Sequence, residues 1–165
     1  MIVLRFPATS LLTAPAPRFV ALTQELLTGA LLEDRDIQHT KQSVAPVASF
    51  LGSGTAHQWA MIGRGHVLAA GGLIQQLFGC AELWLLVSHN ATHADRAAAI
   101  QHCGAVLDQA QQDPTFRRVS IPIHDDEAWL AELVKALGFS TDTKVMLWDV
   151  NGDGWTNYVR IVGVG

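Results

Sequence analysis

Hydrophobic and polar positions divide the middle of the chain into short apolar runs separated by turns. Runs at 58–62, 67–78 and 82–88 alternate with glycine-containing breaks, which predicts three consecutive antiparallel strands. The third run, ELWLLVS, is almost continuously apolar, as is typical of a strand that is covered on both faces. Gly71 and Gly72 interrupt the second run and indicate a bulge or a bend.

The period then becomes helical. Residues 91–112 are rich in alanine and carry apolar side chains at helical spacing, so we expect a helix that ends at Asp113-Pro114. Residues 116–124 alternate and predict a strand. Pro122 within it indicates that part of this strand has a neighbour on one side only.

The C-terminal part predicts one more helix and a hairpin. Residues 125–139 have helical periodicity, with three acids in the expected first turn and Gly138 just after the last periodic position. Strands are expected at 144–150 and 155–162.

The N-terminal third is less regular. It predicts a strand at 1–6, a helix at 18–32 and a second, weaker helix at 40–51, which Pro46 shortens or kinks.

The stretch DVNGDG at 149–154 resembles the start of a calcium-binding loop, because Asp149, Asn151 and Asp153 occupy alternate ligand positions and Gly154 the sixth. The twelfth position, however, is Arg160, a cation where a carboxylate is needed. Asn-Gly and Asp-Gly are also strong hairpin-turn signals, and two strands flank them. We therefore expect a hairpin turn and no metal site.

Composition narrows the class of protein. With 165 residues, 49% of them hydrophobic and 16% charged, the chain is expected to form a single domain over 1–165. The net charge of −4 gives no basic footprint for nucleic acid, and no apolar run is long enough to span a membrane. The two cysteines, Cys80 and Cys103, are expected to be reduced and buried. The N-terminus shows no clear signal peptide, so we expect a cytoplasmic protein or a component of an assembled particle.

The order of these elements resembles that of the GNAT-type N-acetyltransferase superfamily. AWLAELVKALGFS at 128–140 is similar to the helix ending in Leu-Gly-Phe that follows the family's fifth strand. ELWLLVS at 82–88 is similar to its fourth strand. The resemblance implies an α+β fold with an α/β/α-like arrangement. Its mixed, mostly antiparallel sheet would have six or seven strands, splayed between strands four and five, and about four helices would accompany it.

The resemblance also implies a function and a site. It implies transfer of an acetyl group from acetyl-CoA to an amine or protein substrate, with Glu82 as general base and His124 near the arriving amine. Pantetheine would enter between the splayed strands, and the diphosphate would bind at the start of the following helix. The cofactor-binding residues implied are Leu86, Val87, Ser88, Thr92, His93, Ala94 and Arg96.

Three positions depart from the family pattern. The segment SHNATHADRAAA at 88–99 has no glycine, whereas the family loop carries at least one. Val134 stands where a proton-donating tyrosine is expected, and Glu127 stands where an asparagine is common. These departures favour a diverged or catalytically degenerate member, and whether the protein is an enzyme stays open at this point.

The glycine-free loop is also similar to that of GNAT-like proteins encoded by tailed bacteriophages. This leaves a second hypothesis, a non-catalytic protein that acts in virion assembly or as an interaction module. A phage or host protein partner would then be expected, with the protein located in the host cytoplasm or the virion. A homodimer is equally open, because a terminal hairpin can be exchanged between protomers.

Two further pairs of residues contain types that often bind metals or catalyse reactions. His89 and His93 lie four apart, but the first is expected in a loop, so a shared metal ion is not expected. His102 and Cys103 are adjacent on the predicted helix and would point in different directions, which argues against a catalytic pair.

Overall fold

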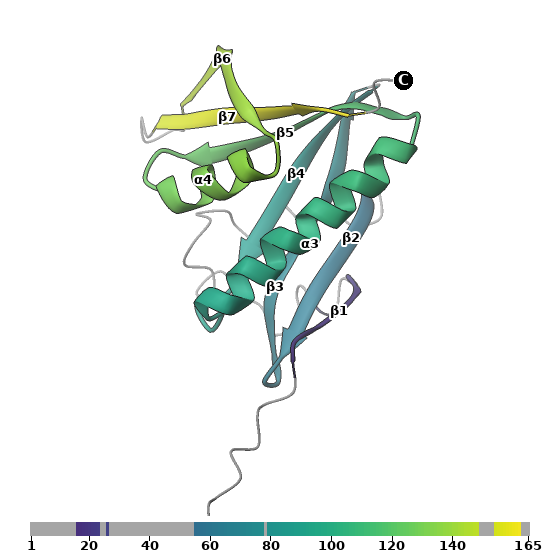
Figure 1. Cartoon of the computed structure of the whole chain (residues 1–165), viewed down its shortest axis with the longest axis vertical. Helices are drawn as coiled ribbons and strands as arrows, with labels where there is room; N and C mark the ends of the chain where they lie inside the picture. Colours follow the sequence, from purple (N-terminus) through teal and green to yellow (C-terminus); the bar gives the residue numbers. More distant parts are fainter. Residues whose placement is uncertain (1–15, 24–25, 27–54, 78, 149–153, 163–165) are drawn as a thin grey trace, which may run out of the picture.

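The computed structural model describes residues 16–23, 26, 55–77, 79–148 and 154–162, and these form a single seven-stranded sheet with two helices. The strands are β1 (Arg18–Ala21), β2 (Thr55–Gly63), β3 (His66–Leu77), β4 (Gly79–Val87), β5 (Phe116–His124), β6 (Ser140–Trp148) and β7 (Gly154–Ile161). The helices are α3 (His93–Gln112) and α4 (Ala128–Ala136). The strand order is β1-β2-β3-β4-β5-β7-β6 (Figure 1).

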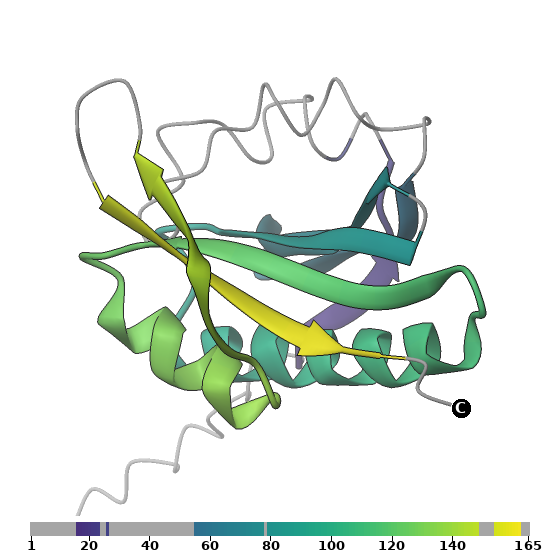
Figure 2. The same ribbon diagram turned by 90° about the horizontal axis from the view of Figure 1, so that it is seen from above.

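The sheet is mixed and mostly antiparallel, as the sequence predicted. Only β4 and β5 run parallel, and α3 makes the crossover between them. Both helices lie on the same face of the sheet (Figure 2). A parallel connection needs a long crossover of this kind, whereas an antiparallel pair such as β2 and β3 is joined by two residues, Arg64 and Gly65.

Side chains of β4 alternate between two apolar cores. Leu83, Leu85 and Val87 pack against the helices, while Trp84 and Leu86 face the opposite side of the sheet. Both sets are buried, which explains why this strand is apolar at almost every position.

The predicted turn and bulge are both present, although the bulge lies in the neighbouring strand. Arg64 and Gly65 have φ values of 51° and 76° and close a two-residue hairpin between β2 and β3. Of the two register shifts between β2 and β3, the one that falls in β2 between Ala56 and Trp59 lies opposite the predicted glycines. A Cβ atom on Gly71 would lie 2.7 Å from Cζ2 of Trp59, so glycine is required there to seat the indole ring.

The prediction of a helix at 18–32 is wrong for its first four residues. Residues 18–21 form β1, which pairs antiparallel with β2. Phe19 stacks on a ring of α3, while Val20 packs into the core on the opposite face, and this alternation is that of a strand. Pairing with the edge of β2 outweighs a weak helical pattern. The other N-terminal predictions, the strand at 1–6 and the helix at 40–51, lie outside the described residues.

The second helix is shorter than predicted. It begins at Ala128, and the three acids at 125–127 precede it in a turn closed by a hydrogen bond from the Glu127 amide to the His124 carbonyl. Its C-terminus agrees with the prediction. Gly138 has φ +84°, and the amides of Gly138 and Phe139 donate to the carbonyls of Lys135 and Val134 in a Schellman motif.

The stretch DVNGDG connects β6 and β7, which pair antiparallel with Trp148 opposite Gly154. The flanking strands are therefore those of a hairpin, while residues 149–153 lie outside the described part. Among the residues that the structure describes, no helix is long and apolar enough to cross a membrane.

Candidate active site

The site begins where β4 and β5 separate. Their parallel pairing runs from Gly79–Phe116 to Glu82–Ser120 and stops, although β4 continues to Val87 and β5 to His124. Beyond this point β4 pairs only with β3, and β5 only with β7. Pro122, which has no amide proton, lies in this unpaired part of β5, as the sequence predicted. Figure 1 shows the two strands diverging.

Glu82 lies at the last paired position, at the apex of this divergence. Alternation along β4 places its side chain on the face opposite α3, with Trp84 and Leu86. It is half-buried, and burial raises the pKa of its carboxyl group. Its oxygen Oε2 accepts a hydrogen bond of 3.3 Å from Nε2 of Gln76. A carboxylate with a raised pKa is suited to accept a proton near neutral pH.

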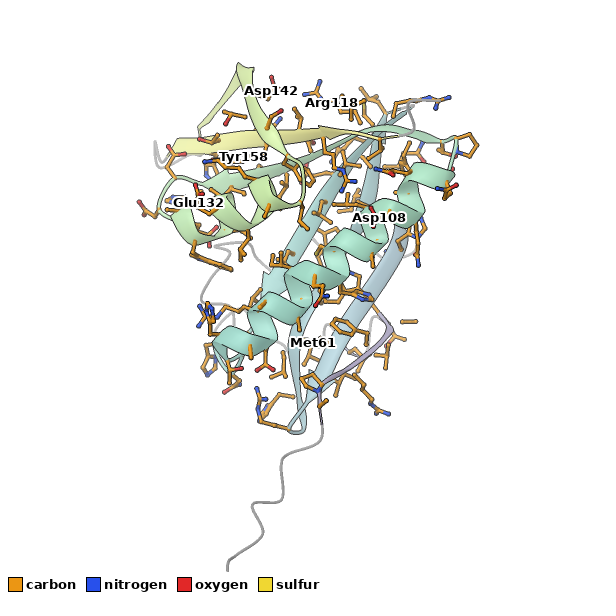
Figure 3. All side chains as sticks on the ribbon, in the orientation of Figure 1. Met61, Asp108, Arg118, Glu132, Asp142 and Tyr158 are labelled. Carbon is orange, nitrogen blue, oxygen red and sulfur yellow. The ribbon has the colours of Figure 1, made fainter. Side chains whose placement is uncertain are left out.

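Arg118, a cation on the same face of β5, is already paired with a carboxylate. The guanidinium of Arg118 donates to Oδ2 of Asp142 on β6 at 2.5 Å (Figure 3). Among the described residues, Glu82 has no cationic partner that would lower its pKa. Among the described residues of this face, Glu82 is therefore a carboxylate whose neighbour on β5, Arg118, is already paired with Asp142.

The start of α3, where the resemblance places a diphosphate, is closed by hydrogen bonds within the chain. The amides of Asn90 and Ala91 donate to Ser88, to its Oγ and its carbonyl oxygen. Thr92 is the N-cap, and it forms a reciprocal capping box with Asp95. The Thr92 amide donates to Oδ2 of Asp95 at 2.7 Å, and the Asp95 amide donates to Oγ1 of Thr92 at 3.2 Å.

Asp95 also binds a cation from the β2–β3 hairpin. The Arg64 guanidinium donates to Oδ2 of Asp95 at 2.5 Å and to the carbonyl oxygen of Asn90 at 3.2 Å. Asp95 is only 4% exposed. Burial raises the pKa of its carboxyl group, but hydrogen bonds from Arg64 and Thr92 outweigh it and leave the pKa lowered. Asp95 is thus a buried carboxylate anion at the positive end of the helix.

The sequence analysis did not predict the Arg64–Asp95 pair, although the sequence around Asp95 contains a recognisable pattern. Thr-His-Ala-Asp at 92–95 fits the capping-box pattern that precedes a helix. Arg64 had no signal, because it reaches the helix through the fold, from 31 residues away.

The remaining predicted cofactor residues differ in exposure. Leu86, Val87 and Ser88 are each at most 1% exposed. Thr92, His93 and Ala94 are exposed at the helix start. The guanidinium carbon of Arg96 lies 5.8 Å from the centre of the Trp129 ring on α4, so this cation bridges the two helices.

His124 is not beside Glu82. It lies four residues beyond Ser120 on β5, roughly 13 Å along the strand at about 3.3 Å per residue. Its Nδ1 accepts a hydrogen bond from the Asp126 amide, and its ring meets Trp155 edge-on. It lines a cavity of about 310 Å³ beneath α4, together with Glu127, Thr156 and Tyr158. Figure 3 shows Tyr158 on the α4 side of the sheet.

Val134, at the position where the resemblance expects tyrosine, is 1% exposed and packs in the core with Leu130.

The contacts of His102 and Cys103 do not support a catalytic pair. The His102 ring stacks on Phe19, with ring centres 4.0 Å apart, and burial raises the pKa of the Cys103 thiol to about 12. Within the described ranges, no group of three or more His, Cys, Asp or Glu could hold a metal ion.

Comparison with solved structures identifies the architecture. The ribosomal-protein-S18-alanine N-acetyltransferase from Escherichia coli superposes with a TM-score of 0.70 and 14% sequence identity. The match covers 90% of this chain and 96% of the E. coli chain. The chain has the GNAT fold. A second GNAT structure, the spermidine N-acetyltransferase from Vibrio cholerae in complex with CoA and spermine, matches 88% of this chain and 95% of its own, with a TM-score of 0.65 and 12% identity.

A third GNAT structure, an acetyltransferase from Elizabethkingia anophelis with acetyl-CoA bound, matches with a TM-score of 0.61 and 9% identity, over 88% of this chain and 98% of its own. No family model and no curated protein matches the sequence. The similarity therefore lies in the GNAT backbone arrangement, and the departures at 88–99, Glu127 and Val134 belong to a sequence that is only 9–14% identical to these three structures.

Proposed function

We propose that the protein is a GNAT-type N-acyltransferase that moves an acyl group from a pantetheine thioester to an amine. The observation that carries this proposal is the divergence of β4 and β5 with Glu82 at its apex. The facing edges of the two strands beyond Glu82 and Ser120 have no ladder partner in each other. An extended arm with amide groups, such as pantetheine, can supply those missing hydrogen bonds.

The reaction forms a C–N bond and breaks a C–S bond. One proton leaves the amine nitrogen, and one proton is taken up by the departing thiolate. Glu82 accepts the first proton, because its pKa is raised by burial and no described cation competes for it. The second proton comes from water, because Val134 has no proton to donate and is buried.

The fit of CoA to the described residues is partial. The strand divergence matches a pantetheine arm, and the amine named for one structural neighbour, spermidine, is consistent with an amine substrate. The start of α3 matches a diphosphate poorly, because a buried carboxylate already accepts the hydrogen bonds of the Thr92 amide and of Arg64.

A non-catalytic role as an interaction module is the second candidate. Val134 in place of an acid and the closed start of α3 favour it. A bacteriophage origin and a virion location stay predictions of the sequence alone. A protein of this kind would acetylate no acceptor, with or without Glu82, which separates the two candidates.

The test uses S-acetylpantetheine and acetyl-CoA as donors, and a peptide with a free N-terminus, a lysine peptide and spermidine as acceptors. Product is measured by mass spectrometry, because Cys80 would interfere with thiol reagents. We expect acetylation of at least one acceptor, lowered by about 10²–10⁴-fold in Glu82→Gln. Glu132→Gln is the matched control, because Glu132 is 73% exposed on α4 and pairs with Lys135. Equal rates in the wild type and Glu82→Gln would exclude the base role.

A further inference from the structure

The start of α3 carries its own anion. Oδ2 of Asp95 accepts hydrogen bonds from the Thr92 amide, from the Thr92 hydroxyl and from Arg64, at 2.7, 2.8 and 2.5 Å. These are the groups with which a helix start binds a phosphate: a free amide, a hydroxyl and a nearby cation. In this chain all three are directed at one internal carboxylate oxygen.

Three of the neighbouring amides are also engaged, whereas those of His93 and Ala94 in the first helical turn have no hydrogen-bond acceptor among the described residues. Those of Asn90 and Ala91 donate to Ser88, and that of Arg96 donates to the Thr92 carbonyl within the first helical turn. A diphosphate placed here would have to displace a 4% exposed carboxylate from its partners, or sit beside it with like charge. Neither arrangement favours binding.

We propose that Asp95 is a built-in substitute for the donor's diphosphate, so that the protein selects its acyl donor through the pantetheine arm alone. This inference rests on the acyltransferase function proposed above and specifies its donor. S-acyl pantetheine, free or as part of a larger carrier, would be recognised as well as acyl-CoA is. The Arg64–Asp95 pair would then serve to hold the β2–β3 hairpin against α3.

The test is calorimetric titration of the full chain with pantetheine, 4′-phosphopantetheine and CoA. We expect dissociation constants within about threefold of one another for the wild type, because the added phosphates meet the Asp95 carboxylate at the start of α3. Binding of CoA at least tenfold tighter than pantetheine would overturn this inference and leave the acyltransferase proposal standing. Binding of none of the three at millimolar concentration would overturn both.

Two variants show whether Asp95 is responsible. Asp95→Asn removes the negative charge but keeps an oxygen that can accept from Thr92, so the helix cap is retained in part. We expect the preference for CoA over pantetheine to rise at least fivefold in this variant. Asp108→Asn is the matched control, since Asp108 lies on the same helix, is 72% exposed and pairs with Arg160. An unchanged preference in a folded Asp95→Asn protein would overturn the role given to Asp95.

Discussion

Replacing Asp95 with alanine tests the closed helix start through stability alone. The variant loses the acceptor of the Thr92 amide, and a lost helix-cap interaction costs about 1 kcal/mol. It also loses the Arg64 ion pair, which adds little because the arginine side chain is 38% exposed and screened by water. We expect a total loss of about 1–2 kcal/mol, equivalent to a drop in melting temperature of about 2–8 °C for a chain of this size.

The same perturbation can be resolved into its parts. Asp95→Asn keeps an oxygen acceptor and should lose about half as much, whereas Thr92→Ala should lose about 1 kcal/mol. Because the two residues share one network, the double variant should lose less than the sum of the single losses. Differential scanning calorimetry at pH 7 compares the four variants with the wild type. A drop of less than 1 °C for Asp95→Ala would refute the interpretation of the capping box and its ion pair.

The pH dependence adds a check of sign. The folded-state pKa of Asp95 is lowered, so its contribution is present above the unfolded value of about 3.9 and is lost as pH falls through the lower folded value. The stability difference between the wild type and Asp95→Asn should therefore stay constant between about pH 5 and 8 and shrink only in more acidic solution. A difference that vanished near pH 7 would point to another group.

Three further predictions follow from the fold. Gly138→Ala should destabilise the protein by about 1 kcal/mol in urea unfolding, because φ is +84° there, and a neutral effect would contradict the Schellman motif. Gly71→Ala should cost about 1–3 kcal/mol, since its Cβ would overlap Trp59; wild-type stability would mean that the indole lies elsewhere. A thiol reagent should modify half-buried Cys80 in the native protein and Cys103 only after unfolding, because burial raises the Cys103 pKa to about 12; two fast native thiols would be the contrary result.

The elements with strong local patterns were predictable. The helix at 91–112 and the strand at 116–124 were each located within two residues, because periodicity and the breaks that end them are properties of the local sequence. Residues 18–21 were not, because four residues are too few for a period to distinguish a strand from a helix. Their conformation is decided by pairing with residues of β2 that lie 38 to 44 positions away in the sequence.

The candidate site shows the same limit. Pro122 indicated that β5 would lose a neighbour, but only the three-dimensional register shows that pairing ends at Glu82 and Ser120. The capping box of Thr92 and Asp95 could have been predicted from its spacing, whereas the contribution of Arg64 could not. Contacts that join distant segments depend on strand register and on the geometry of turns, and neither is contained in a local pattern.

The central claim, that Glu82 is the general base of an acyl transfer, is tested most directly by the pH dependence of kcat/KM for the wild type and Glu82→Gln. The ionisation of the amine acceptor enters both profiles equally, so their ratio isolates Glu82. The account predicts that the wild-type advantage appears as pH rises through an apparent pKa above the ordinary glutamate value of about 4.3, in the direction that burial gives. A ratio of one at every pH would contradict the claim.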